Sequence, residues 1–288
     1  MDASSSDYPA VRLILSGDRL QDLRFVQALS EGSYPIHLAR EHFWKLESLK
    51  EKFEIPLAVA LGDELLLSDF EIVHERPLTR LGSIERPLIF PRAFFGYLKG
   101  LWSASRDLDY SFLGLMTPVR AEALNAWLER QGASQRIPHP FVLRVHRYLQ
   151  KKMGWIGWSA KGITQFTFKT QHGSIMLGAS DKGRVFPGKA WDDDYFRMLA
   201  RSRFVLCPSG DFVWTYRFFE SAMCGAIPIV EATCPSYEGF RYFTMDDRLE
   251  DLEWSADTAE HNFNACLERL TISREELDTE MSKLLGRA

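Results

Sequence analysis

One stretch near the C-terminal end constrains the fold of this 288-residue chain more than any other: residues 201–231, RSRFVLCPSGDFVWTYRFFESAMCGAIPIVE. It contains two short, mainly apolar runs, 203–207 and 226–230, with an amphipathic stretch, 214–224, between them. Apolar runs without polar alternation are typical of strands that helices cover on both sheet faces. The stretch therefore predicts a strand, a loop over residues 208–213, a helix and a second, parallel strand.

In the rest of the chain, short apolar runs alternate with amphipathic stretches in a similar way, which predicts an α/β protein with parallel sheets. Between residues 76 and 100 the pattern loosens, and three prolines, Pro77, Pro87 and Pro91, discourage a regular ladder there. We therefore expect one domain over residues 1–100 and a second over 101–288. The expected strands are 11–15, 35–39, 56–61, 69–74, 110–115 and 175–177, and the expected helices are 20–29, 41–53, 119–130 and 193–200, with a C-terminal amphipathic region over 257–285.

Composition and charge exclude several classes of protein. With 45% hydrophobic and 26% charged residues, the chain has the composition of an ordinary globular protein. The formal charge of -4 is spread without a Lys/Arg block, which argues against nucleic acid as a partner. The N-terminal residues lack the features of a signal peptide, and no window approaches the ~18 apolar residues of a membrane span. We expect a cytoplasmic chain without a transmembrane segment, for which peripheral membrane contact stays open.

The four cysteines and the acidic triplet do not predict a metal site. Cys207, Cys224, Cys234 and Cys266 show neither a C-x-x-C pair nor the density of a disulfide-rich domain, so we expect four reduced thiols. The triplet 192–194 superficially offers a D-x-D motif for a divalent cation. We interpret it as the N-cap and first turn of the helix at 193–200, where carboxylates complement the helix dipole.

The loop between the two C-terminal strands carries the most readable chemistry. In an open parallel sheet, ligands bind outside the carboxyl ends of the strands. The small residues Ser209 and Gly210 would let backbone N–H groups approach an anion there. Arg217 falls in the first turn of the following helix, and Glu220 lies on nearly the same face. An arginine for phosphate beside a carboxylate for ribose hydroxyls suits a nucleotide diphosphate. Spacing alone leaves open a plain surface ion pair beside a glycine turn.

The same segment resembles the C-terminal signature of exostosin-type glycosyltransferases. In that signature a Ser-Arg-Phe-x-Leu-Cys-Pro-x-Gly strand and loop is followed by an Arg-Phe-x-Glu-Ala helix and a Gly-x-Ile-Pro-Val strand. The preceding helix around Tyr195 also fits the family, and the strand and helix leading to Arg120 resemble an earlier part of it. The matching pieces are residues 202–210, 217–222 and 225–230.

The resemblance implies two facing Rossmann-like domains, the GT-B arrangement, with the sugar-nucleotide donor on the C-terminal domain and the acceptor mainly on the N-terminal one. It implies a glycosyltransferase that moves a sugar, UDP-linked by preference, to a glycan hydroxyl. Transfer would be inverting and independent of metal, with no cofactor besides the donor. The short N-terminal half and the loop 211–214 depart from the family, which leaves the donor and the acceptor open. The donor-binding residues expected in the matching segment are Ser209, Gly210, Arg217 and Glu220. Arg120 and Arg184 are further candidates for the diphosphate because both follow expected strands, and Tyr216 is one because its ring could stack on a base or sugar.

An inverting transferase needs a base for the acceptor hydroxyl and cations for the leaving diphosphate. We expect Arg217 to serve the leaving group. Asp18, which directly follows the first strand, is the preferred base. Five other side chains at strand ends of the first half stay open for this role: His37, Asp63, Glu64, His74 and Glu75.

Two other functions remain open. A GDP-fucose-dependent fucosyltransferase also has a Phe-Val-Leu-Cys strand, but its Tyr-x-Thr-Glu-Lys helix start is replaced here by Thr215-Tyr216-Arg217. A non-catalytic module that binds glycans or nucleotides would keep the same Rossmann-like unit. Two aromatic features could contact a ligand or pack internally: the pair Trp214 and Tyr216, and the stretch 153–162 with Trp155 and Trp158.

Overall fold

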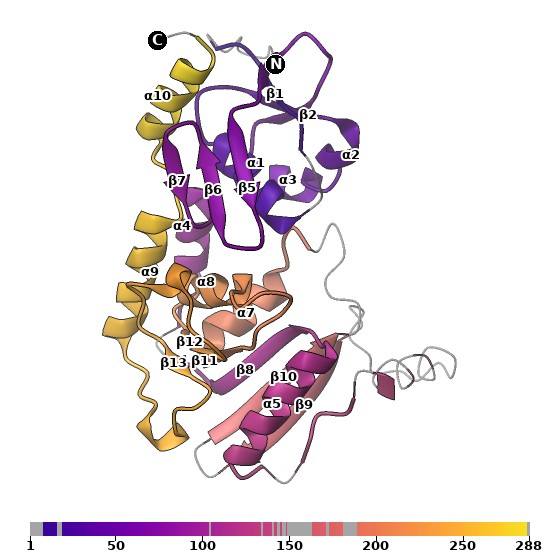
Figure 1. Ribbon diagram of the computed structural model, residues 1–288, viewed down its shortest axis with the longest axis vertical. Helices are drawn as coiled ribbons and strands as arrows, with labels where there is room; N and C mark the ends of the chain where they lie inside the picture. The colour runs from indigo at the N-terminus through magenta and orange to yellow at the C-terminus, as the bar shows by residue number, and fades with distance from the viewer. Residues whose placement is uncertain are drawn as a thin grey trace. The chain divides into compact units, whose positions relative to one another are not determined.

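The computed structural model describes residues 8–15, 19–103, 105–133, 135–139, 163–170, 173–180 and 189–286, with positions 141, 142, 145 and 148. The chain forms two compact units (Figure 1). Unit 1 comprises residues 1–97, 186–192 and 266–288, and unit 2 comprises residues 98–185 and 193–265. The end of the chain thus belongs to the same unit as its beginning.

Unit 1 contains a parallel four-stranded sheet in the order β3-β2-β1-β4. The expected strands at 11–15, 35–39 and 56–61 are confirmed as β1, β2 and β3. The sequence does not predict β4, an edge strand of three residues in which Leu65 and Leu66 are exposed. The elements are β1 (Val11–Leu13), α1 (Leu20–Leu29), β2 (Ile36–Leu38), α2 (Arg40–Phe43), α3 (Glu47–Phe53), β3 (Leu57–Val59) and β4 (Leu65–Leu67). The single helix expected over 41–53 is therefore interrupted by a turn at residues 44–46.

A three-stranded antiparallel sheet follows in the order β5-β6-β7, formed by β5 (Phe70–Val73), β6 (Leu78–Leu81) and β7 (Ile84–Arg86). The expectation that prolines prevent a ladder between residues 76 and 100 was wrong. Pro77 and Pro87 lie just outside the paired strands, where no ladder N–H is needed. Pro91 directly precedes helix α4 (Arg92–Gly100), a position that proline tolerates.

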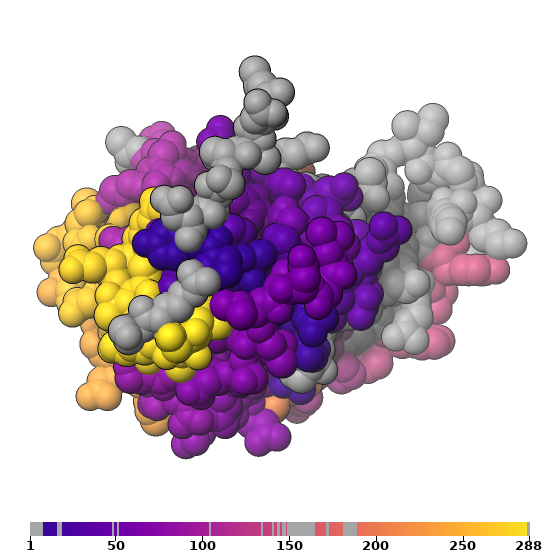
Figure 2. All heavy atoms as spheres, turned by 90° about the horizontal axis from the view of Figure 1, so that it is seen from above, coloured from indigo at the N-terminus to yellow at the C-terminus, as the bar shows by residue number. Residues whose placement is uncertain are grey.

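The C-terminal helix α10 (Arg274–Leu284) packs within unit 1. Asp278 accepts hydrogen bonds from the backbone N and Oγ of Ser33, at 2.6 and 2.7 Å. Glu280 accepts two equivalent bonds from Ser83 in the β6–β7 turn, at 2.6 and 2.9 Å. Figure 2 shows this yellow segment beside the indigo N-terminal residues. The amphipathic C-terminal region is therefore divided: from Cys266 onward it completes unit 1, while its first residues belong to unit 2.

Unit 2 contains a six-stranded sheet in the order β13-β12-β11-β8-β10-β9, in which only β9 is antiparallel to its neighbour. The expected strands at 110–115, 175–177, 203–207 and 226–230 are confirmed as β8, β10, β11 and β12. The hairpin partner β9 was missed. The elements are β8 (Leu108–Leu115), α5 (Pro118–Arg130), β9 (Ile163–Thr170), β10 (Gly173–Ser180), α7 (Asp193–Arg201), β11 (Ser202–Cys207), α8 (Tyr216–Met223), β12 (Ile227–Val230), η1 (Pro235–Tyr237), β13 (Phe243–Thr244), η2 (Leu249–Asp251) and α9 (Ala256–Arg269).

The core of unit 2 lies on the sheet face that α5 covers (Figure 1). Leu124 and Trp127 of α5 are fully buried against alternate residues of the strands, including Phe112, Ile175 and Ile229. Helices α7 and α8 contact β8, β11 and β12. Helices thus pack on an apolar sheet. This is a mixed α/β fold, compatible with Rossmann-like domains.

The strand order places a topological switch at β8. After β8 the chain forms α5, β9 and β10, with both strands on one side of β8. It then passes through α7 to β11 on the other side and continues through α8 to β12, further from β8. The loops that follow β8 and β11 therefore diverge at the carboxyl ends of two adjacent strands. This is where open α/β sheets form a ligand-binding crevice. Across the described part of the chain, no helix is long and apolar enough to cross a membrane.

Candidate functional site

The side chain of Arg217 reaches the carboxyl end of β8 from the first turn of α8. Thr215 caps that helix, because its Oγ1 accepts a hydrogen bond from the backbone N of Arg217 at 3.4 Å. The guanidinium donates through Nε to the carbonyl oxygen of Leu113 at 3.2 Å and lies 4.3 Å from the ring centroid of Phe112. Only 7% of Arg217 is exposed. Its Nη1 has no hydrogen-bond partner among the residues that the structure describes.

Arg120, near the start of α5, connects the two diverging loops. Its Nε donates to the carbonyl oxygen of Ser209 and its Nη1 to that of Leu115, each at 3.1 Å. Burial, followed by the repulsion of Arg217, lowers the pKa of Arg120 to about 10. Both guanidiniums are thus held by neutral carbonyl oxygens and repel one another. Asp211 attracts Arg120 and partly offsets this repulsion. Two neighbouring guanidiniums remain groups that favour an anion.

Each of these guanidiniums lies against a glycine, where a side chain would take up its space. A Cβ atom on Gly114 of β8 would collide with Nη2 of Arg217, and one on Gly210 would collide with Nη2 of Arg120. Gly210 belongs to the expected donor-binding loop. Gly114 was not singled out, although an isolated glycine within a strand is a signal for close approach of another group.

The backbone N–H groups of Ser209 and Gly210 are not free for an anion, contrary to the expectation from the sequence. The backbone N of Ser209 donates to Glu231 Oε2 at 2.9 Å, and that of Gly210 donates to the carbonyl oxygen of Phe212 at 3.1 Å. Both donors are therefore used inside the chain. The positive potential here comes from Arg120 and Arg217 and not from a backbone cradle.

Glu220 is buried one turn after Arg217 in α8, with 1% of the residue exposed. The hydroxyl of Tyr195, on α7, donates to Glu220 Oε2 at 2.6 Å. This contact fixes the carboxylate beside the site and links α7 to α8. The sequence placed Tyr195 in the right helix but gave no reason to pair it with Glu220.

The aromatic residues around the loop pack with one another. Tyr216 is half-buried, and its ring lies 5.0 Å from that of the buried Trp214. Tyr237 stacks on Phe218 at 3.8 Å, and its hydroxyl accepts a hydrogen bond from the backbone N of Thr215 at 2.9 Å. Internal packing thus accounts for Trp214, while Tyr216 keeps part of its surface available.

Several expected residues fall elsewhere. Asp18, the preferred base, and Arg184 lie outside the described residues, as does the stretch 153–162. Two of the alternative bases, His37 and Glu64, meet within unit 1, where His37 Nδ1 lies 2.8 Å from Glu64 Oε1. Glu64 also accepts hydrogen bonds from the backbone N of Leu61 and Gly62 at 2.6 and 2.8 Å. These two bonds and His37 lower the pKa of Glu64 to about 2. This carboxylate therefore anchors the loop before β4.

The acidic triplet begins a helix, as the sequence predicted. Asp193 and Asp194 form the first turn of α7, and Asp192 precedes it. No group of three or more His, Cys, Asp or Glu side chains that could hold a metal ion occurs within the ranges that the structure describes. All four cysteines are free thiols, three of them buried.

A second buried arginine of unit 2 offers an internal comparison. Arg106 donates to the carbonyl oxygens of Ala200, Ser202 and Cys224 at 2.8, 2.7 and 3.1 Å, and burial lowers its pKa to about 10. These carbonyls end α7, begin β11 and follow α8, so Arg106 ties together the opposite, amino end of the sheet. Arg217, whose side chain has one carbonyl partner, lies at the carboxyl end of β8 instead.

No protein-family model matches this chain, and no curated protein is significantly similar to it.

Proposed function

We propose that this chain is a glycosyltransferase that moves a sugar from a nucleotide diphosphate donor, UDP-linked by preference, to a glycan hydroxyl. The observation that carries the proposal is the pair of guanidiniums, Arg120 and Arg217, at the carboxyl ends of β8 and β11. Neither guanidinium forms an ion pair within the part of the chain that the structure describes, and Nη1 of Arg217 has no hydrogen-bond partner there, so it can donate to a ligand oxygen. A diphosphate supplies the missing negative charge and acceptors.

The roles of the two charged residues of α8 follow from their chemistry. Charge-assisted bonds from Arg217 strengthen as negative charge grows on the departing diphosphate, so this residue would act on the transition state. Glu220 can only accept hydrogen bonds, which suits the hydroxyl groups of a ribose. Tyr195 keeps the carboxylate oriented for that role.

In this proposal unit 2 holds the donor and unit 1 receives the acceptor, as in the GT-B arrangement, and transfer is inverting. The two arginines would offset the charge of the leaving group, so activity should persist in EDTA. Loss of activity in EDTA with rescue by Mn²⁺ would assign the leaving-group role to a metal ion.

Thermal unfolding of the full chain with UDP, GDP, CMP and their sugars tests the nucleotide site. A ligand at a hundred times its Kd stabilises the folded state by about 2.7 kcal/mol. We expect UDP and a UDP-sugar to raise the Tm of the wild type and to have much less effect on Arg217→Ala. The control variant is Arg130→Ala, which removes an exposed arginine of α5 that pairs with Asp246.

A response to UDP that Arg217→Ala reduces and Arg130→Ala keeps supports the proposed site. A response to GDP alone would favour the fucosyltransferase alternative. If no nucleotide changes the Tm, the donor site is wrong and a glycan-binding module without catalysis becomes the better explanation.

A further inference from the structure

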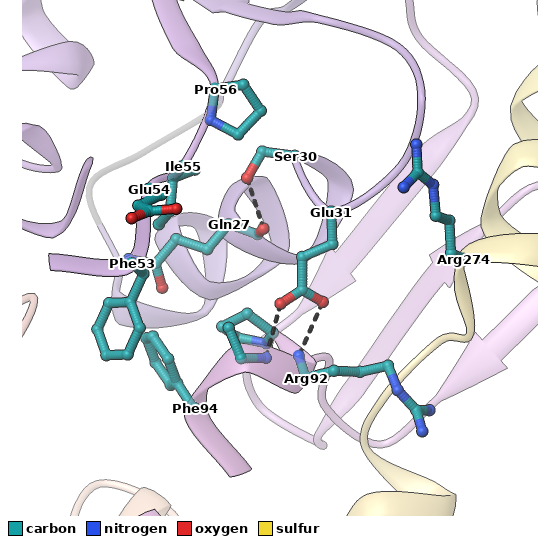
Figure 3. A pocket seen from close by; sticks show the side chains of 12 residues that line it. Gln27, Ser30, Glu31, Phe53, Glu54, Ile55, Pro56, Arg92, Phe94 and Arg274 are labelled. Carbon is teal, nitrogen blue, oxygen red and sulfur yellow. Dashed lines mark hydrogen bonds between the residues drawn. The ribbon is translucent and has the colours of Figure 1, made fainter. Parts of the chain in front are cut away.

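Unit 1 contains a pocket that the proposed donor site does not use. Its volume is about 350 Å³, at the small end of the range for small-molecule sites. The last turn of α1 forms one wall, residues 53–56 before β3 form another, and the start of α4 and Arg274 complete it (Figure 3). These segments precede β3 or follow α1, so the pocket lies at the amino end of the sheet. Ligands of open parallel sheets bind at the other end.

The polar groups of the pocket include a buried donor without a partner. Gln27 is fully buried, and its Oε1 accepts a hydrogen bond from Arg24 Nη1 at 2.9 Å, which fixes the orientation of the amide. Its Nε2 makes no hydrogen bond to any part of the chain that the structure describes. Figure 3 shows the Gln27 side chain running from α1 toward Phe53. A buried amide N–H without an acceptor costs free energy, so this donor calls for a ligand acceptor.

Glu31 supplies the opposite kind of group. Its two carboxylate oxygens each accept one N–H from the start of α4, from Arg92 and Ala93, both at 2.8 Å. Figure 3 shows this carboxylate between α1 and α4. Each oxygen keeps a further lone pair for a ligand donor. The pocket therefore offers both a donor and an acceptor.

The apolar part of the lining and its charge balance further limit the class of ligand that fits the pocket. The rings of Phe53 and Phe94 lie 4.8 Å apart at one end of the pocket (Figure 3). Two carboxylates, Glu31 and Glu54, are matched by two guanidiniums, Arg92 and Arg274, so the lining has no net charge that would select an anion or a cation. Sugar hydroxyls both donate and accept, and the C–H faces of a sugar ring pack on aromatic rings.

We propose that this pocket binds a neutral sugar ring, as a carbohydrate site separate from the nucleotide site of unit 2. The proposal does not depend on catalysis, because it concerns binding alone. In a transferase such a site would hold a part of the glycan that does not react. Gln27 would donate to a ring hydroxyl, and Glu31 would accept from a neighbouring one.

Ligand-observed NMR on the full chain, with a panel of neutral mono- and disaccharides, tests the proposal. The sharpest variant is Gln27→Glu, because it keeps an oxygen for Arg24 but replaces the unpartnered N–H by an acceptor. We expect this change to weaken sugar binding about tenfold or more, and Glu31→Gln to weaken it less, because one amide oxygen remains. Thermal unfolding of each variant shows that it is folded.

The Arg217→Ala variant is the matched control, since it changes the nucleotide site only. Sugar binding that survives Arg217→Ala and falls in Gln27→Glu supports the pocket, whatever the outcome of the nucleotide panel. Failure of every neutral sugar to bind, or equal binding by the wild type and Gln27→Glu, would overturn the proposal. Binding of charged sugars alone would also overturn it.

Discussion

Gly114 of β8 leaves the space in which the guanidinium of Arg217 lies: a Cβ atom at this position would collide with Nη2. The same guanidinium donates to the carbonyl oxygen of Leu113, the residue before this glycine. Because Gly114 has no side chain, the guanidinium of Arg217 can lie against β8. This relationship makes the site sensitive to a single methyl group.

We expect Gly114→Ala to displace Arg217 and to weaken nucleotide binding about tenfold or more, the effect of one lost charge-assisted hydrogen bond. Calorimetric titration with the nucleotide that responds in the thermal panel measures it. Gly96→Ala is the control, because a Cβ there meets no heavy atom within 4 Å. Unchanged binding by Gly114→Ala would show that the position of Arg217 is not needed.

Arg217→Ala should weaken donor binding about tenfold and lower kcat by a larger factor, on the order of 10² or more, because its bonds strengthen as the diphosphate departs. Steady-state kinetics with the donor found by the nucleotide panel measures both parameters. A near-normal kcat in this variant would remove Arg217 from the chemical step.

Glu220→Gln should chiefly raise the donor KM, by a factor that corresponds to roughly 1 to 3 kcal/mol for a polar contact left unpaired. Tyr195→Phe should act in the same direction, because it removes the hydroxyl that donates to Glu220. The double variant should lose less binding free energy than the two single variants lose together, since both changes act on one contact. Loss of kcat in Glu220→Gln with normal KM would mean that the carboxylate takes part in the reaction.

Glu64 should make stability depend on acid pH. Its pKa is lowered from 4.5 to about 2, so the ionised carboxylate stabilises the folded state above the ordinary pKa. That contribution falls as the pH drops from about 4.5 toward 2. We expect Glu64→Gln to be less stable than the wild type at neutral pH and the difference to shrink across this range. Urea unfolding at several pH values measures it, and a constant difference would contradict the prediction.

The cysteines should differ in reactivity. Burial raises the pKa of Cys207 to about 12 and raises that of Cys224 further, so both remain thiols at neutral pH. Cys266 is buried as well, whereas Cys234 is half-buried. Alkylation of the native protein should therefore modify Cys234 first, and unfolding should expose three more thiols. Mass analysis that finds fewer than four alkylated cysteines after unfolding without reductant would indicate a disulfide.

The sequence by itself determined the local structure of the candidate site. The apolar runs at 203–207 and 226–230 became parallel strands, because each is buried on both faces and has no alternative period. Arg217 and Glu220 followed from their positions in the first turns of an amphipathic helix. These features depend on neighbours within a few residues, which a sequence pattern records.

Only the tertiary structure decided which groups meet. Arg120 and Ser209 are 89 residues apart, and Tyr195 and Glu220 belong to different helices, so no local period could pair them. The use of the Ser209 N–H by Glu231, the strands between Pro77 and Pro87, and the pocket around Gln27 likewise depend on contacts between distant segments. Propensity and spacing determine the helices and strands, while packing determines which polar groups find partners and which do not.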